Sequence, residues 1–129
     1  MKKSDYVRIF DSFIDNDISC GVLLIGNIPI SDKLEILENV SQRLQIEFGK
    51  EVCLITNEIS KEKSELKVFN QSDSPFDFVP DNDCIFLCLL KKPYFDNNGW
   101  YNDMLSELTY YNRTFLGFTT GEQKIVFYE

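Results

Sequence analysis

The sequence predicts an α/β (α+β) fold with a mixed sheet of about five strands, three helices and a C-terminal antiparallel hairpin. Short, almost wholly apolar runs alternate along the chain with longer stretches whose apolar residues recur at spacings of three and four. Near the C-terminus, two short apolar runs flank a Thr-Gly-Glu turn, a pattern typical of paired strands. With 129 residues and 43% hydrophobic side chains, we expect residues 1–129 to form one globular domain.

Three amphipathic stretches predict helices, at residues 5–17, 31–49 and 97–112. Ser31 is a favourable N-cap residue, and Gly49 suits the left-handed conformation that often follows a helix. In the third stretch, Trp100, Tyr101 and Leu108 fall on one side, which we expect to be buried. The connections between these stretches hold the predicted strands.

The predicted strands are residues 20–26, 51–56, 66–69, 84–90, 114–119 and 124–128. The run at 20–26 is almost wholly apolar, which suits a central strand covered on both faces. A helix connects it with the run at 51–56, so we expect those two strands to be parallel. Apolar and polar side chains alternate at the start of residues 66–69, which predicts a short edge strand. Residues 57–65 predict a loop or a helical turn, and residues 70–83 predict a long loop.

The charge of the chain excludes several classes of function. Asp and Glu number 21 against 13 Lys and Arg, which gives a net charge of −8 without any histidine. The absence of histidine excludes Ser-His-Asp and Cys-His catalysis and histidine-bound zinc. A field of this sign repels nucleic acids and anionic membranes and attracts basic proteins. We therefore expect a protein partner.

The four cysteines (Cys20, Cys53, Cys84 and Cys88) lie inside or beside apolar runs, where cysteine acts as a small buried hydrophobe. Their spacing lacks the paired knuckles of a zinc site, and a chain of this size needs no disulfides. The N-terminus shows no signal peptide, and no apolar run approaches the ~20 residues that span a bilayer. We expect a cytoplasmic protein without a cofactor or metal.

One triplet suggests an enzyme as the alternative. Glu65 and Lys67 form an E-x-K pattern, which on a strand can supply a metal-binding carboxylate and a cation for phosphodiester hydrolysis. Such a site needs another carboxylate, for which Glu51 and Glu58 are the nearest candidates. Residues 26–29 follow an apolar strand but lack the glycine spacing of a phosphate-binding loop.

Charge is distributed unevenly along the chain. Residues 68–112 contain seven acidic side chains and two basic ones, together with many aromatic rings. Acids steer a basic partner at long range and rings anchor it after contact. The alternative to a binding surface is that the aromatic rings of the third helix belong to the hydrophobic core and that the acidic side chains keep the protein soluble. The candidate partner-binding residues are Asp77, Phe78, Asp81, Asp83, Trp100, Asp103, Glu107 and Tyr110.

In general character the chain resembles the bacterial toxin-immunity proteins of contact-dependent inhibition and polymorphic toxin systems: small, acidic single domains without a catalytic constellation. The resemblance implies a non-catalytic inhibitor in a tight one-to-one complex with a cognate basic toxin, usually a nuclease. The carboxylates would then meet Lys or Arg of the toxin, while Phe78, Trp100 and Tyr110 act as anchors.

Two further alternatives remain open. A phage-type inhibitor that mimics DNA would space its carboxylates regularly along one face and would bind with strong salt dependence. A structural subunit would associate with itself, edge to edge, through residues 66–69 or the C-terminal strand. We expect a monomer or a weak homodimer.

Overall fold

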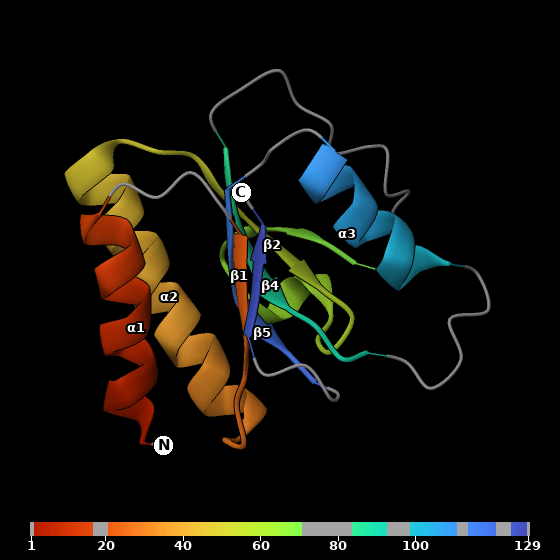
Figure 1. The fold of residues 1–129 in the computed structure, drawn as a ribbon, viewed down its shortest axis with the longest axis horizontal. Coiled ribbons are helices and arrows are strands. Elements are labelled where there is room, and N and C mark those ends of the chain that lie inside the picture. Colours follow the sequence, from red (N-terminus) through yellow and green to blue (C-terminus); the bar gives the residue numbers. More distant parts are fainter. Residues whose placement is uncertain are drawn as a thin grey trace.

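The computed structural model describes residues 2–16, 21–70, 84–92, 99–110, 114–120 and 125–128, with the side chains of Lys61 and the last segment omitted. These residues form three layers (Figure 1). Helices α1 (Lys3–Asp15) and α2 (Ile30–Phe48) cover one face of a central sheet, and α3 (Trp100–Tyr110) covers the other. None of these helices is long and apolar enough to cross a membrane.

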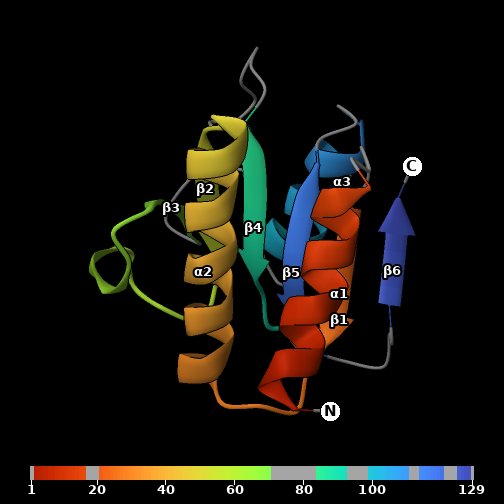
Figure 2. The same ribbon diagram turned by 90° about the vertical axis from the view of Figure 1, so that its left-hand side faces the viewer.

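The sheet has six strands in the order β3-β2-β4-β5-β1-β6. They are β1 (Gly21–Ile25), β2 (Val52–Thr56), β3 (Lys67–Phe69), β4 (Ile85–Leu89), β5 (Phe115–Thr119) and β6 (Ile125–Tyr128). The five strands from β3 to β1 are all parallel. Strand β6 joins them antiparallel, on the outer side of β1 (Figure 2). A 3-10 helix, η1 (Lys61–Lys63), lies between β2 and β3.

The predicted sheet is wrong, because β5 and β6 do not form a hairpin. Both edges of β5 are occupied by parallel neighbours: Gly117 is in register with Leu23 of β1 and with Cys88 of β4. A strand buried at all five positions gains more from two apolar neighbours than from one hairpin partner. Strand β6 therefore pairs with the next free edge, that of β1.

The prediction that the strands at residues 20–26 and 51–56 are neighbours is also wrong. Strands β1 and β2 do belong to one parallel array, joined through α2, but β5 and β4 lie between them. The run at 20–26 therefore forms the strand next to the edge, and β4 and β5 occupy the centre. Apolar runs of this kind predict burial on both faces but contain no information about which run is the neighbour.

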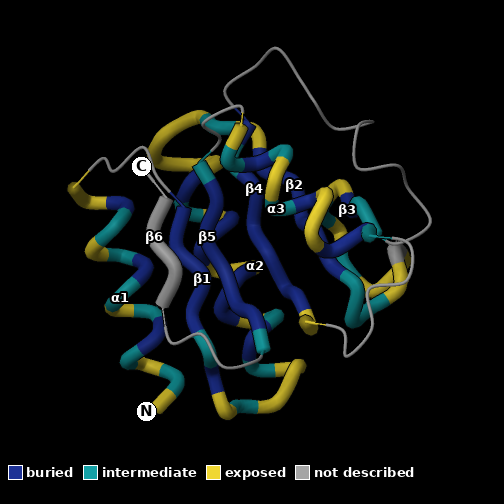
Figure 3. Tube along the Cα trace, turned by 45° about the vertical axis from the view of Figure 1, so that its right-hand side comes forward, coloured by how far each residue is buried: buried dark blue, intermediate teal, exposed yellow. Residues whose placement is uncertain are grey.

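Two hydrophobic clusters fill the space between the layers, and strands β1, β2, β4 and β5 are buried along nearly their whole length (Figure 3). On the α1/α2 side the ring of Phe118 meets the rings of Tyr6 and Phe10 edge to face, with centroids 5.5 and 5.4 Å apart. On the α3 side, Met104 and Leu108 are fully buried against the sheet. The alternation along each strand divides its side chains between the two clusters.

Two glycines are required by the backbone. Gly49 ends α2 with a φ of 62°, and its N–H bonds to the carbonyl of Gln45, so the predicted C-terminal residue is confirmed. At the start of α2 the N-cap is Pro29 rather than Ser31. In β5, a Cβ on Gly117 would lie 2.0 Å from the carbonyl oxygen of Cys88, so only glycine allows β4 to approach this closely.

Candidate protein-binding face of α3

The eight predicted partner-binding residues fall into two groups. Asp77, Phe78, Asp81 and Asp83 lie outside the residues that the structure describes. Trp100, Asp103, Glu107 and Tyr110 all belong to α3. Of these four, Trp100 lies in the hydrophobic core with 4% of its surface exposed, so its ring is not presented to a partner.

Helix α3 separates its residues cleanly by side. Trp100, Tyr101, Met104 and Leu108 are buried and face the sheet. The backbone N–H of Asp103 donates to the carbonyl of Gly99, 2.8 Å away, which places Asp103 in the first turn. A carboxylate in that position is favoured by the helix dipole.

Asp103, Glu107 and Tyr110 follow one another at spacings of four and three and so share one side of α3. We call these three residues the acidic face of α3. Asp103 is exposed, and Tyr110 leaves 78% of its surface open to solvent. The helix contains no basic residue, so nothing within α3 neutralises the two carboxylates.

The carboxylate of Glu107 is incompletely satisfied. Within the described part of the chain its Oε2 atom is shielded from solvent and accepts no hydrogen bond. Glu58, beyond the end of β2, has the other such atom. A carboxylate oxygen that loses water without gaining a donor costs free energy.

On the other side of the sheet, several carboxylates pair with Arg43 and Lys3. Arg43 of α2 pairs with Asp11 at 2.9 Å, with Asp15, and with Glu47 at 2.9 Å. The hydrogen bonds that Arg43 donates to these carboxylates raise the pKa of Arg43 above its ordinary value. Lys3 of α1 likewise pairs with Glu35 of α2 at 2.8 Å, which raises the pKa of Lys3. These contacts connect α1 with α2.

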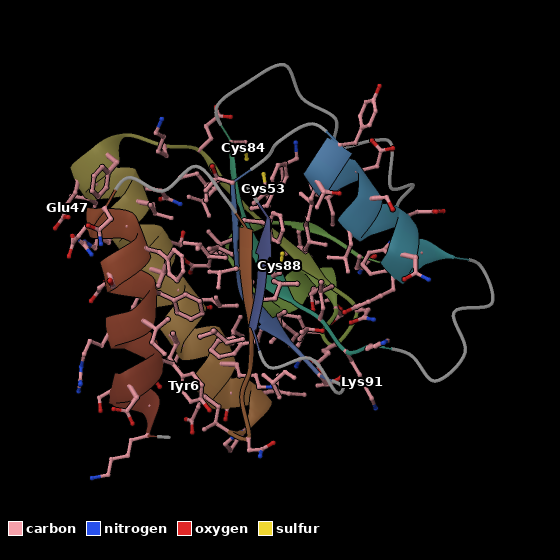
Figure 4. The ribbon with its side chains drawn as sticks, viewed as in Figure 1. Tyr6, Glu47, Cys53, Cys84, Cys88 and Lys91 are labelled. Atoms are coloured by element: carbon pink, nitrogen blue, oxygen red, sulfur yellow. The ribbon has the colours of Figure 1, made fainter. Side chains whose placement is uncertain are left out.

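The carboxyl ends of the parallel strands meet in a polar network that the sequence did not indicate. The hydroxyl groups of Tyr101 and Thr119 lie 2.7 Å apart in a buried contact between α3 and β5. The backbone N–H and carbonyl of Lys91 bond to the side chain of Asn57, both at 2.7 Å, which joins the ends of β4 and β2. Lys91 lies at this end in Figure 4.

Lys33 is a further residue whose position the sequence did not indicate. It lies in the first part of α2 with only 4% of its surface exposed, and its Nζ is 5.8 Å from the centroid of the Phe118 ring. A cation over an aromatic face is stabilised by the ring quadrupole. Burial of a lysine against the core is not visible in the sequence, because its neighbours Asp32 and Glu35 indicate a solvated helix face.

The predicted enzyme site does not assemble in the described residues. Glu65 and Lys67 are exposed at the edge strand β3. No group of three or more His, Cys, Asp or Glu side chains in the described ranges is arranged to hold a metal ion. Comparison of the chain with family models, curated proteins and solved structures found no match. Function must therefore be argued from the geometry of the chain itself.

Proposed function

We propose that this protein is a non-catalytic inhibitor of the immunity-protein type, which binds and neutralises a basic protein toxin through the acidic face of α3. The observation that carries the proposal is the contrast in charge compensation. Arg43 and Lys3 neutralise carboxylates on the α1/α2 side, whereas Asp103 and Glu107 form no ion pair within the described residues.

The arrangement suits the two stages of protein association. A net charge of −8 attracts a basic partner over a distance of about 8–10 Å at ordinary ionic strength. After contact, the ring of Tyr110 supplies apolar area with a polar tip, a combination enriched at binding hot spots. The exposed carboxylate of Asp103 then accepts hydrogen bonds from Lys or Arg of the partner.

Asp77, Phe78, Asp81 and Asp83 lie outside the described residues, and their part in binding stays a prediction from the sequence. We place the protein in the cytoplasm as a monomer or weak homodimer, acting without a cofactor and binding neither nucleic acid nor membrane. A nuclease is the proposed toxin class, because carboxylates compete for the same Lys and Arg side chains that bind substrate phosphates.

Affinity capture from the source cells tests the proposal. The bait is the full chain, compared with the variant Asp103→Asn, Glu107→Gln, Tyr110→Ala. The control is Glu38→Gln, Glu62→Gln, which removes the same number of charges from exposed positions of α2 and η1. We expect the wild type and the control to retain one basic protein, with the variant binding it at least about 30-fold more weakly.

Co-expression supplies the functional result. The captured protein should be toxic when expressed alone, and the wild type and control should remove that toxicity where the α3 variant does not. Equal capture by all three baits would refute the assignment of the acidic face. Capture of an acidic protein, or of none, would refute the inhibitor function.

A further inference from the structure

Two cysteine sulfur atoms meet at the amino ends of neighbouring strands. Cys53 is the second residue of β2, and Cys84 immediately precedes β4. Their Sγ atoms lie 3.2 Å apart, although the residues are 31 positions apart in the chain. Figure 4 shows the two residues at one end of the sheet, with Cys88 further along β4.

Sheet register explains why the two thiols meet. Strands β2 and β4 are parallel, with Val52 opposite Ile85, and the N–H of Ile85 bonds to the carbonyl of Glu51 at 2.8 Å. Both cysteine side chains contribute to the cluster on the α3 side of the sheet. Cys53 and Cys84 retain 8% and 5% of their surface exposed, whereas Cys88, in the same cluster, has none.

The contact makes the two thiols chemically different. Cys84 donates its S–H to the sulfur of Cys53, which lowers the pKa of Cys53 below its ordinary value. Lys67, the register partner of Cys53 on β3, lowers that pKa further, while burial and Glu51 act against it. The same hydrogen bond raises the pKa of Cys84. Burial alone raises the pKa of Cys88.

We propose that Cys53 and Cys84 form a redox-active dithiol that small peroxides convert reversibly into an intramolecular disulfide. With hydrogen peroxide, the thiolate of Cys53 attacks one peroxide oxygen, the O–O bond breaks, and the sulfur becomes a sulfenic acid. The departing hydroxide takes up the proton that Cys53 released on ionising and leaves as water. The thiol of Cys84 then attacks that sulfur, releasing a second water as the disulfide forms. The dithiol loses two electrons and the peroxide gains them.

The geometry requires only a small movement. A disulfide bond measures about 2.05 Å, so the sulfur atoms must approach by roughly 1.2 Å from their present separation. Cys84 lies outside the regular hydrogen-bonded part of β4, where the backbone has more freedom than within a strand. Reduction by two equivalents of a thiol, such as glutathione, restores the dithiol, as expected of a disulfide in a reducing compartment.

Peroxide titration of the reduced, folded full chain tests this inference. One equivalent of hydrogen peroxide should remove two of the four thiols and lower the intact mass by two hydrogens. Peptide mapping should then find Cys53 linked to Cys84, and excess glutathione should reverse the change. The control variants Cys20→Ser and Cys88→Ala should form the same bond. Intact thiols after treatment, or a disulfide between other cysteines, would overturn the proposal.

Single substitutions separate the two roles. Cys84→Ala should stop the reaction at a sulfenic acid on Cys53, trapped by dimedone, and Cys53→Ala should abolish that adduct. Because Cys84→Ala also removes the hydrogen bond to Cys53, the pKa of Cys53 should rise. The pH midpoint of its alkylation by iodoacetamide should therefore move upward from the wild-type value. An unchanged midpoint would show that Cys84 does not activate Cys53.

Discussion

The two sides of the sheet are stabilised by different means. On the α1/α2 side, the rings of Tyr6 and Phe10 in α1 pack edge to face on Phe118 of β5. Ion pairs of Arg43 and Lys3 connect α1 with α2. On the α3 side, a single helix of 11 residues packs through Met104 and Leu108 over a cluster that includes three cysteines.

The difference shows where the molecule uses its charges internally. Carboxylates near Arg43 are committed to holding α1 against α2, so their contribution to the outer field is reduced by a nearby cation. Carboxylates on α3 have no such cation within the described residues. Among the described residues, the ion pairs that connect helices therefore lie on the α1/α2 side, and the charges proposed to act on other molecules lie on the α3 side.

Core truncation should give the largest effect and should test which side contributes more to stability. Phe118→Ala removes a fully buried ring with two edge-to-face contacts, so we expect a loss of about 4 kcal/mol in the free energy of unfolding. Met104→Ala on the α3 side should cost about 3 kcal/mol. Urea unfolding of both variants measures the difference, and a larger loss for Met104→Ala would reverse the comparison.

Removal of one buried hydroxyl should give an intermediate effect. Tyr101→Phe deletes the hydrogen bond to Thr119 and leaves a buried oxygen without a donor, which should cost about 1.5 kcal/mol. The matched change Tyr110→Phe, at an exposed position, should alter stability by less than about 0.5 kcal/mol. Thermal unfolding of both variants shows whether stability depends on the hydrogen bond between Tyr101 and Thr119 or falls whenever a tyrosine hydroxyl is removed.

Loss of Arg43 should have the smallest effect and should depend on salt. Arg43→Met leaves Asp11, Asp15 and Glu47 without their shared cation, and we expect a loss of about 1 kcal/mol at low ionic strength. The difference from wild type should shrink in 1 M salt, where the Debye length is about 3 Å. Arg8→Met, at a highly exposed position, is the control. A loss independent of salt would show that Arg43 acts through packing.

Local structure was predictable where one element contains its own signal. The apolar stripe and Gly49 defined α2, and the helical phase of Trp100, Tyr101 and Leu108 predicted the buried side of α3. Strand order was not predictable, because several runs are equally apolar and their pairing is decided by three-dimensional competition. The contact between Cys53 and Cys84 depends on that order, so the sequence showed two separate buried thiols rather than a pair.

The placement of β1 has a consequence for synthesis of the chain. Strand β1 pairs with β5 on one edge and with β6 on the other. The register partners of Gly21, Phe115 and Tyr128, are therefore synthesised about a hundred residues after it. A nascent chain leaves the ribosome from its N-terminus, and β1 therefore emerges long before its partners. Strand pairs so distant in sequence form slowly, because the chain between them must lose conformational entropy before the new contacts stabilise the pair. Until β5 and β6 have both emerged, an apolar strand with an open edge can bind a chaperone or pair with another chain.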